Sequence, residues 1–179
     1  DTLSLHDALP ILKTITELRG ISCIPLEEHS MTRKSCCTTR SFGKLLTNLE
    51  DIEQAVTTFA RRAAERIRSE SLAASCVSVF VRTNPFDKKS AYYSNGASRT
   101  LSHPTHDSIT IIETALLLTK RIFKNNYQYK KAGVLLSGLC DKSEIQETLF
   151  EKNYNQNSDL MSAIDAINYR YGQDTLQMA

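Results

Sequence analysis

The chain of 179 residues is long enough for one domain of ordinary size with extra segments at its ends. It has no apolar run near the ~20 residues that a membrane-spanning helix needs, and its start lacks the basic-then-apolar layout of a secretory signal peptide. The five cysteines include no C-x-x-C pair, and Cys36 and Cys37 are adjacent. These features favour a cytoplasmic chain with reduced thiols and no membrane partner.

The net charge of +2 hides an uneven distribution. Residues 34–140 carry 16 Lys/Arg and 8 Asp/Glu, residues 1–33 carry 3 and 5, and residues 141–179 carry 3 and 7. A middle of +8 therefore lies between flanks of −2 and −4. This pattern indicates a polyanionic partner for the middle of the chain, although charge alone leaves a solvated surface equally open.

The first residues, DTLSLHDALPIL, do not match the rest of the chain. They resemble a translated sequencing adapter, so we expect residues 1–12 to be non-native and to make few contacts with residues 34–140. Residues 13–19 are predicted to end a helix, with Gly20 as its stop. Residues 21–33, which include Pro25, are predicted to form a tether.

The next part of the chain predicts the element order β-α-β-β-α-β. Predicted strands cover residues 34–42, 75–83, 96–102 and 131–139. Asn48 is predicted to cap a first helix, with apolar residues at helical spacing from Ile52 to Ile67, and Asp107 a second. This order predicts an α+β fold of the ferredoxin-like split β-α-β type, in which both helices cover one face of a four-stranded antiparallel sheet. Flexible tails and a short C-terminal helix are expected to complete it.

The other face of such a sheet would stay open. In the strand at 75–83, Val77, Val79 and Val81 alternate with more polar positions that include Ser78 and Arg82. The valines are expected to face the helices, which leaves the polar positions on the open face. A sheet face with Arg, Ser and Thr side chains can lie against a nucleic-acid backbone.

Residues 141–157 are acidic and rich in Asn and Gln, and they predict a linker. Leu149 and Phe150 stand inside it, although burying such side chains is worth roughly 1.5–3 kcal/mol each and a linker offers nothing to bury them against. Ser158 begins an amphipathic segment with Leu160, Met161, Ile164 and Ile167. It is too short to be stable alone, so we expect it either to dock on something or to begin a further domain.

No signature of catalysis stands out. Paired carboxylates, a glycine-rich phosphate loop and a Ser-His-Asp order are all missing, and we expect neither catalytic residues nor metal ligands. His103 and His106 form HPTH, which Pro104 is expected to place in a loop rather than in a zinc site. Cys140 has no partner histidine placed by the sequence and is expected to be a buried thiol at a strand end.

Six motifs in order resemble the little-finger domain of Y-family DNA polymerases, most closely its UmuC type. They are RSFGK at 40–44, FARRAAERIRSE at 59–70, VFVRTNPF at 79–86, YYSNGAS at 92–98, PTHDS at 104–108 and YQYKKAGVLL at 127–136. The resemblance implies that residues 13–33 are the end of the thumb domain and a tether, and that residues 34–140 are the little finger. Residues 158–179 would begin a truncated C-terminal extension.

The resemblance also implies a function. Little fingers grip the backbone of the damaged template–primer duplex, whereas the catalytic carboxylates and the Mg²⁺ belong to the palm domain of the parent enzyme. The chain is therefore expected to bind DNA without polymerising it and without a cofactor, within an enzyme that copies damaged DNA in the SOS response. The basic middle of the chain and the polar strand face predict which residues contact DNA: Arg40, Ser41, Phe42, Gly43, Lys44, Arg82, Arg99 and Thr100.

The same resemblance explains the apolar pair in the linker. Gln146, Leu149 and Phe150 match a Gln-x-x-Leu-Phe peptide by which bacterial polymerases bind the sliding clamp. Leu149 and Phe150 would fill an apolar pocket while Gln146 fixes the register, and the intervening Glu147 and Thr148 should weaken the binding. The alternative is that the pair folds back onto its own domain. The C-terminal extension further implies UmuD′ and RecA as partners.

A stand-alone ferredoxin-like module that binds RNA or a protein is the alternative function. An RNA reader usually offers two or three aromatic side chains on its open sheet. Phe42 and Phe80 could serve, but Arg40, Ser41 and Arg82 favour contacts to a nucleic-acid backbone.

Overall fold

The computed structural model describes residues 5–23, 33–87, 90–145 and 157–177. The chain divides into two units, residues 1–32 and residues 33–179. The first unit contains helix α1 (Leu5–Leu18), which includes Pro10 and is followed by Gly20 at a φ of +81°. The predicted helix stop at Gly20 is confirmed. Ile11 is 57% exposed within this unit, and the non-native origin of residues 1–12 stays a prediction.

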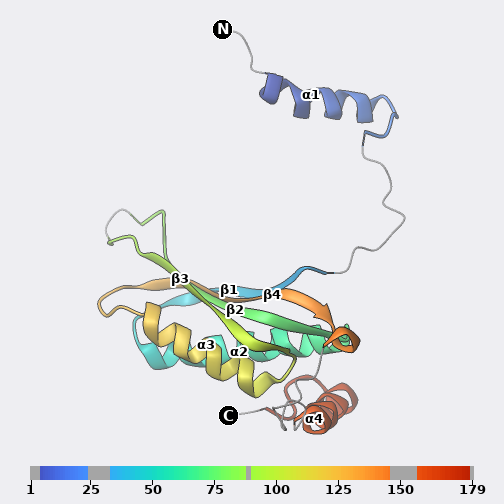
Figure 1. Cartoon of the computed structure of the whole chain (residues 1–179). Coiled ribbons are helices and arrows are strands. Elements are labelled where there is room, and N and C mark those ends of the chain that lie inside the picture. Colours follow the sequence, from blue (N-terminus) through green and yellow to red (C-terminus); the bar gives the residue numbers. More distant parts are fainter. Residues whose placement is uncertain (1–4, 24–32, 88–89, 146–156, 178–179) are drawn as a thin grey trace. The chain divides into compact units, whose positions relative to one another are not determined.

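The second unit is a four-stranded sheet with two helices on one face (Figure 1). Its elements are β1 (Ser35–Leu46), α2 (Leu49–Ser69), β2 (Leu72–Thr83), β3 (Ser94–Thr105), α3 (Ser108–Ile122) and β4 (Tyr129–Asp141). The strands lie in the order β1-β4-β2-β3, and every neighbouring pair is antiparallel. This arrangement confirms the predicted α+β class and its β-α-β-β-α-β order. A short 3-10 helix, η1 (Lys142–Glu144), and helix α4 (Ser158–Tyr171) come after β4.

The core lies between the sheet and helices α2 and α3. Val77, Val79 and Val81 of β2 are at most 1% exposed, as the alternation in the sequence predicts. Ile52 and Ile67 of α2 are fully buried against the same layer. Because alternate residues of a strand point to opposite faces, burial of this valine row leaves the intervening residues of β2 on the face that the helices do not cover.

Of the two side-chain caps predicted at the helix starts, the cap of α3 is present and the cap of α2 is not. The Asp107 carboxylate accepts hydrogen bonds from the backbone N–H groups of Ile109 and Thr110, both at 3.2 Å, so its predicted capping role is confirmed. Asn48 occupies the N-cap position of α2, but its side chain makes no capping hydrogen bond. The helix begins where the sequence places it, without the predicted side-chain cap.

The strands are longer than their sequence signals. β3 continues through His103 and Pro104 to Thr105, so the expected HPTH loop is wrong. Proline lacks an N–H group and is tolerated in edge strands, and β3 is an edge of this sheet. No helix in the described ranges is long and apolar enough to cross a membrane.

Helix α4 docks beside α2 and α3. Met161 of α4 is 1% exposed, and Asp165 forms an ion pair with Arg68 of α2. At the start of this segment the Asn157 amide donates to the Asp107 carboxylate at 3.2 Å. The segment therefore docks on its own domain, which is one of the two outcomes expected from the sequence; that it begins a further domain stays a prediction.

Candidate nucleic-acid interface

The strand register assigns each side chain of the sheet to one of its faces, because directly opposed residues in an antiparallel pair share a face. Val79 opposes Val134 of β4 and Ala97 of β3, on the helix side. Its neighbour Phe80 opposes Gly133 and Gly96 and therefore lies on the other side. The side chains that share the face of Phe80 define the open face: Ser35, Cys37, Thr39 and Ser41 of β1, Lys131, Gly133, Leu135 and Ser137 of β4, Cys76, Ser78 and Arg82 of β2, and Ser94, Gly96, Ser98 and Thr100 of β3.

Two cations stand directly opposite each other on the central strands of this face. Arg82 of β2 is the register partner of Lys131 of β4, and neither makes an ion pair within the described part of the chain. None of the residues that define the open face is acidic. Like charges directly opposite each other destabilise a sheet, so an anion bound between them would relieve a repulsion that the free chain bears.

Hydroxyl side chains surround this pair of cations. Ser94 opposes Arg82 from β3, and Ser41 opposes Lys131 from β1. Serine and threonine hydroxyls donate hydrogen bonds to phosphate oxygens and carry no base specificity by themselves. The composition of the open face therefore suits a phosphate backbone.

Phe80 forms the apolar centre of the open face, packed across the backbone of Gly133. A Cβ atom added at Gly133 would lie 2.6 Å from ring atoms Cε1 and Cζ of Phe80 and 2.8 Å from the Thr39 Cβ. The ring thus occupies the space that a side chain at position 133 would need. This close fit explains why a glycine stands in the middle of a central strand, where it would otherwise weaken the strand.

Replacing Gly133 by alanine is expected to destabilise the domain by about 1–3 kcal/mol, the usual range for overpacking. The new methyl group would collide with Phe80 and Thr39, which flank it on both neighbouring strands. Chemical denaturation measures the loss. Gly43→Ala is the matched control, because a Cβ at Gly43 meets nothing within 4 Å. Equal stability of the two variants would show that the packing of Phe80 on Gly133 does not matter.

The structure divides the residues predicted to contact DNA into three groups. Ser41, Arg82 and Thr100 lie on the open face. Arg40 and Arg99 are exposed, but they oppose Ala132 and Val77 and so belong to the helix side of the two edge strands. The edge positions leave both guanidinium groups in solvent at the borders of the sheet.

The third group lies in the distal part of β1, where the pairing with β4 shifts between Ser41 and Leu46. Gly43 and Lys44 are exposed there. Phe42 is partly buried against the core, and its carbonyl accepts a hydrogen bond from the Lys130 Nζ at 2.7 Å. Phe42 is therefore a packing residue and not an aromatic platform of the open face.

Sequence reasoning missed Lys131 as a member of the interface. It begins the predicted strand at 131–139, and the alternation that buries Ala132 and Val134 places it outward with Gly133. The alternation along this strand could therefore have identified Lys131. It does so only if one knows which residues of this short apolar strand face the core. Gln146, Leu149 and Phe150, the predicted clamp-binding residues, lie outside the described residues.

The structure also describes the surroundings of the histidine and cysteine residues that were considered for metal binding or catalysis. Among the described residues, no group of three or more His, Cys, Asp and Glu is arranged to hold a metal ion. Burial, with the charges of Lys142 and Arg68, lowers the pKa of His106. Burial also raises the pKa of the Cys140 thiol, and Glu144 and Asp141 raise it further, which disfavours the thiolate that a cysteine nucleophile requires.

Comparison with known proteins identifies the class of domain that this fold and open face define. Residues 33–149 match the impB/mucB/samB family C-terminal domain. The chain is 36% identical to Protein UmuC of Salmonella typhimurium (strain LT2) over 176 residues, which cover 97% of this chain and 42% of that protein. It is 40% identical to Protein MucB of Escherichia coli over 160 residues, or 88% of this chain and 38% of that protein.

Solved structures show the same fold at low sequence identity. An insertion ternary complex of Dbh DNA polymerase matches with a TM-score of 0.50 and 10% identity, over 74% of this chain and 36% of that one. A Y-family DNA polymerase chimera of Dbh and Dpo4 matches with a TM-score of 0.51 and 14% identity over the same shares. The chain therefore belongs to the UmuC/ImpB/MucB family and carries its C-terminal domain. The fold of this domain is shared with part of a Y-family DNA polymerase chimera. The chain spans about two fifths of the length of the curated relatives it matches.

Proposed function

We propose that the open face binds the phosphate backbone of duplex DNA without reading its sequence. The observation that carries this proposal is the Arg82–Lys131 pair, which no carboxylate neutralises within the described part of the chain. The surrounding hydroxyls add uncharged donors, and the exposed cations Arg40, Lys44 and Arg99 lie at the edges of the sheet. A 30% identical relative named DNA polymerase IV, from Streptococcus mutans, supports DNA as the polyanion.

The alternative, an RNA- or protein-binding module, fits the open face less well. Phe80 is its only aromatic residue among the paired positions, and its ring packs on Gly133. Readers of single-stranded RNA usually stack bases on two or three aromatic side chains of the sheet. Backbone contact through cations and hydroxyls therefore agrees better with the residues present.

For the full-length protein we propose translesion DNA synthesis in the cytoplasm during the SOS response. Its palm domain would hold the Mg²⁺ and the catalytic carboxylates, and the domain described here would contribute duplex grip without chemistry of its own. UmuD′ and RecA are the proposed partners of the C-terminal extension. Residues 146–150 are the proposed attachment to the sliding clamp, because Gln146, Leu149 and Phe150 have the types and spacing of a clamp-binding peptide.

Duplex binding should weaken steeply with salt. Each phosphate neutralised in B-DNA contributes a slope of about −0.9 to log K against log salt, so four to five contacts predict a total of roughly −3.6 to −4.5. Fluorescence titration of the full chain against two unrelated duplexes at several salt concentrations measures this slope. An affinity that ignores salt, or a strong preference for one of the two sequences, would contradict the proposal.

A further inference from the structure

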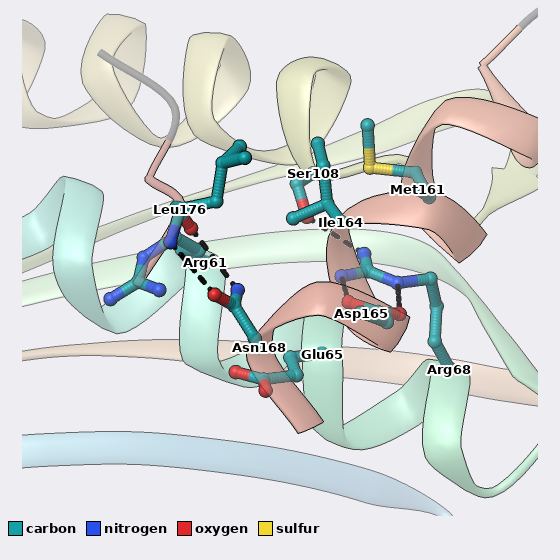
Figure 2. A pocket seen from close by; sticks show the side chains of 9 residues that line it. All are labelled: Arg61, Glu65, Arg68, Ser108, Met161, Ile164, Asp165, Asn168 and Leu176. Carbon is teal, nitrogen blue, oxygen red and sulfur yellow. Dashed lines mark hydrogen bonds and ion pairs between the residues drawn. The ribbon is translucent and has the colours of Figure 1, made fainter. Parts of the chain in front are cut away.

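The second half of α2 carries a row of arginines on the side of the helix that faces away from the sheet. Arg61, Arg62 and Arg68 form what we call the arginine face. Figure 2 shows residues of the C-terminal segment, here residues 157–177, beside Arg61 and Arg68 of this face. Each arginine of the face is engaged by a carboxylate of this segment.

Arg68 makes the most complete of these contacts. Its Nε and Nη2 donate to the two carboxylate oxygens of Asp165 at 2.7 and 2.8 Å. Its Nη1 donates to the His106 carbonyl at 2.9 Å and to the Ser108 hydroxyl at 2.7 Å. These two protein contacts belong to the β3–α3 junction, so they hold the guanidinium in place independently of α4.

Arg61 and Arg62 converge on a single carboxylate. Both donate to Asp174, the second through its Nη2 at 3.3 Å. The hydrogen bond from Arg61 is the main cause that lowers the pKa of Asp174 below its usual value. Two guanidinium groups around one anion resemble the way arginines gather around a phosphate.

Two of the three arginines of this face are largely buried where they pair with the C-terminal segment, whereas the Arg62 side chain is 45% exposed. The side chains of Arg61 and Arg68 are only 10% and 9% exposed, with Asp174 and Asp165 as their partners. Met161 at 1% and Asn168 at 4% exposed anchor the segment, and Asn168 exchanges hydrogen bonds with the backbone of Leu176 at 2.8 and 3.1 Å. A segment with three Asp and one Arg thus covers cations of a domain whose central residues carry a net charge of +8.

The contacts made by these carboxylates are ones that a phosphodiester can also make. The planar fork of arginine matches carboxylate and phosphate in the same bidentate geometry. Arg68 is already held by the His106 carbonyl and the Ser108 hydroxyl, so an incoming phosphate would meet one preorganised guanidinium group there. Arg61 and Arg62 lie on the same helix and would exchange the Asp174 carboxylate for a phosphate. Glu65, the one acidic residue of α2 beside them, would oppose this binding only in part.

We propose that the arginine face of α2 is a second binding surface for the DNA backbone, and that the C-terminal segment occupies it as an acidic competitor. DNA gains this surface when the segment leaves. The ligand class is that of the open face, but the residues are different and lie on the opposite side of the sheet. Because the segment and DNA compete for the same guanidinium groups, each must weaken the binding of the other by the same factor.

The first test uses the full chain with Asp165→Asn and Asp174→Asn. Asp159→Asn with Glu144→Gln is the matched control, since it removes the same charge from two exposed residues that make no ion pair in the described part of the chain. We expect the first variant to bind duplex at least fivefold more tightly than the control. Its salt slope should be steeper by about 1.8–2.7, for two to three added phosphates. Equal affinities and slopes would overturn the proposal.

The second test needs no substitution. Saturating duplex should speed hydrogen exchange of the α4 amides from Met161 to Asn168 in the unaltered chain. Exchange that stays the same at saturation would mean that DNA does not compete with the segment. A result in which Asp165→Asn with Asp174→Asn frees α4 but leaves DNA affinity at the control value would show a purely structural latch and would also overturn the proposal.

The test of the arginine face can be separated from the test of DNA binding by the open face. Removing charge from Arg82 and Lys131 tests the sheet, and the comparison of the two carboxylate variants can be repeated in that background. A surviving difference between them would support the arginine face even if the open face proved irrelevant. Loss of the difference in both backgrounds would leave the open face untouched and reject the second surface.

Discussion

Replacing both Leu149 and Phe150 by alanine is expected to abolish binding of the chain to a bacterial sliding clamp. A short linear peptide buries little surface and loses conformational freedom on binding, so the starting affinity should be modest, on the order of micromolar, or about −8 kcal/mol. The two apolar side chains would supply most of it. Phe150→Ala alone should cost about 2 kcal/mol, which is roughly thirtyfold in Kd.

The same double variant should fold normally. The core cluster is built from residues between Cys36 and Leu136, and residues 149 and 150 come after the last strand of the sheet. Isothermal titration against the clamp, beside a thermal melt, measures both properties. Asn153→Ala with Asn155→Ala changes polar residues of the same linker and should leave clamp binding intact. Retained clamp binding by the Leu149/Phe150 variant, or a lowered melting temperature, would show that the pair packs onto its own domain.

Removing the charges of Arg82 and Lys131 is expected to weaken duplex binding by roughly thirtyfold, if each phosphate contact is worth about 1 kcal/mol. Glutamine is the suitable replacement at both positions, because it keeps much of the side-chain length and can still donate a hydrogen bond. Folding stability should be unchanged or slightly higher, since the substitution ends a like-charge contact between directly opposed residues. Fluorescence anisotropy and chemical denaturation measure the two effects.

A control variant separates a local contact from the effect of net charge. Lys120→Gln with Arg121→Gln removes the same charge from exposed residues at the end of α3, one of the helices that cover the other face of the sheet. Its affinity for duplex should fall by no more than about threefold, as expected for long-range electrostatics alone. A similar loss in both variants would mean that the overall charge of the domain attracts DNA and that the open face has no special part in it.

The sequence predicted the fold well because its strongest patterns are local. The valine alternation of β2 predicts one buried face of the sheet, and the helical spacing from Ile52 to Ile67 predicts one buried face of α2. These two faces pack against each other and form the helix and sheet layers of the domain. Asp107 worked as a cap signal because its hydrogen bonds reach only two or three residues along the chain. Strand ends were predicted less well, as β3 shows, because the ladder with β2 carries the strand past His103 and Pro104.

The interface was predicted less completely because it depends on register. Arg40 and Ser41 are adjacent in sequence, yet pairing with Ala132 and Lys131 places them on opposite faces. Phe42 follows the phase of Arg40 and packs against the core. Lys131 joins Arg82 only through the β2–β4 ladder, which brings together residues 49 positions apart. A list of basic and polar residues along the chain does not contain this information.

Docking of the C-terminal segment was beyond sequence reasoning for a related reason. The amphipathic pattern after Ser158 shows that a surface must be covered, but it does not show which one. The answer comes from ion pairs between residues about a hundred positions apart, Arg68 with Asp165 and Arg61 with Asp174. The opposite charges of the middle and the end of the chain were the one sequence signal for this contact.

The salt dependence of duplex binding, compared between the unaltered chain and Arg82→Gln with Lys131→Gln, tests the central claim most directly. If the open face holds two phosphates through these cations, the slope of log K against log salt should become shallower by about 1.8 in the variant, from the loss of two contacts at about 0.9 each. The Lys120/Arg121 control should keep the original slope. An unchanged slope in the Arg82/Lys131 variant would contradict the claim that the DNA backbone lies on the open face.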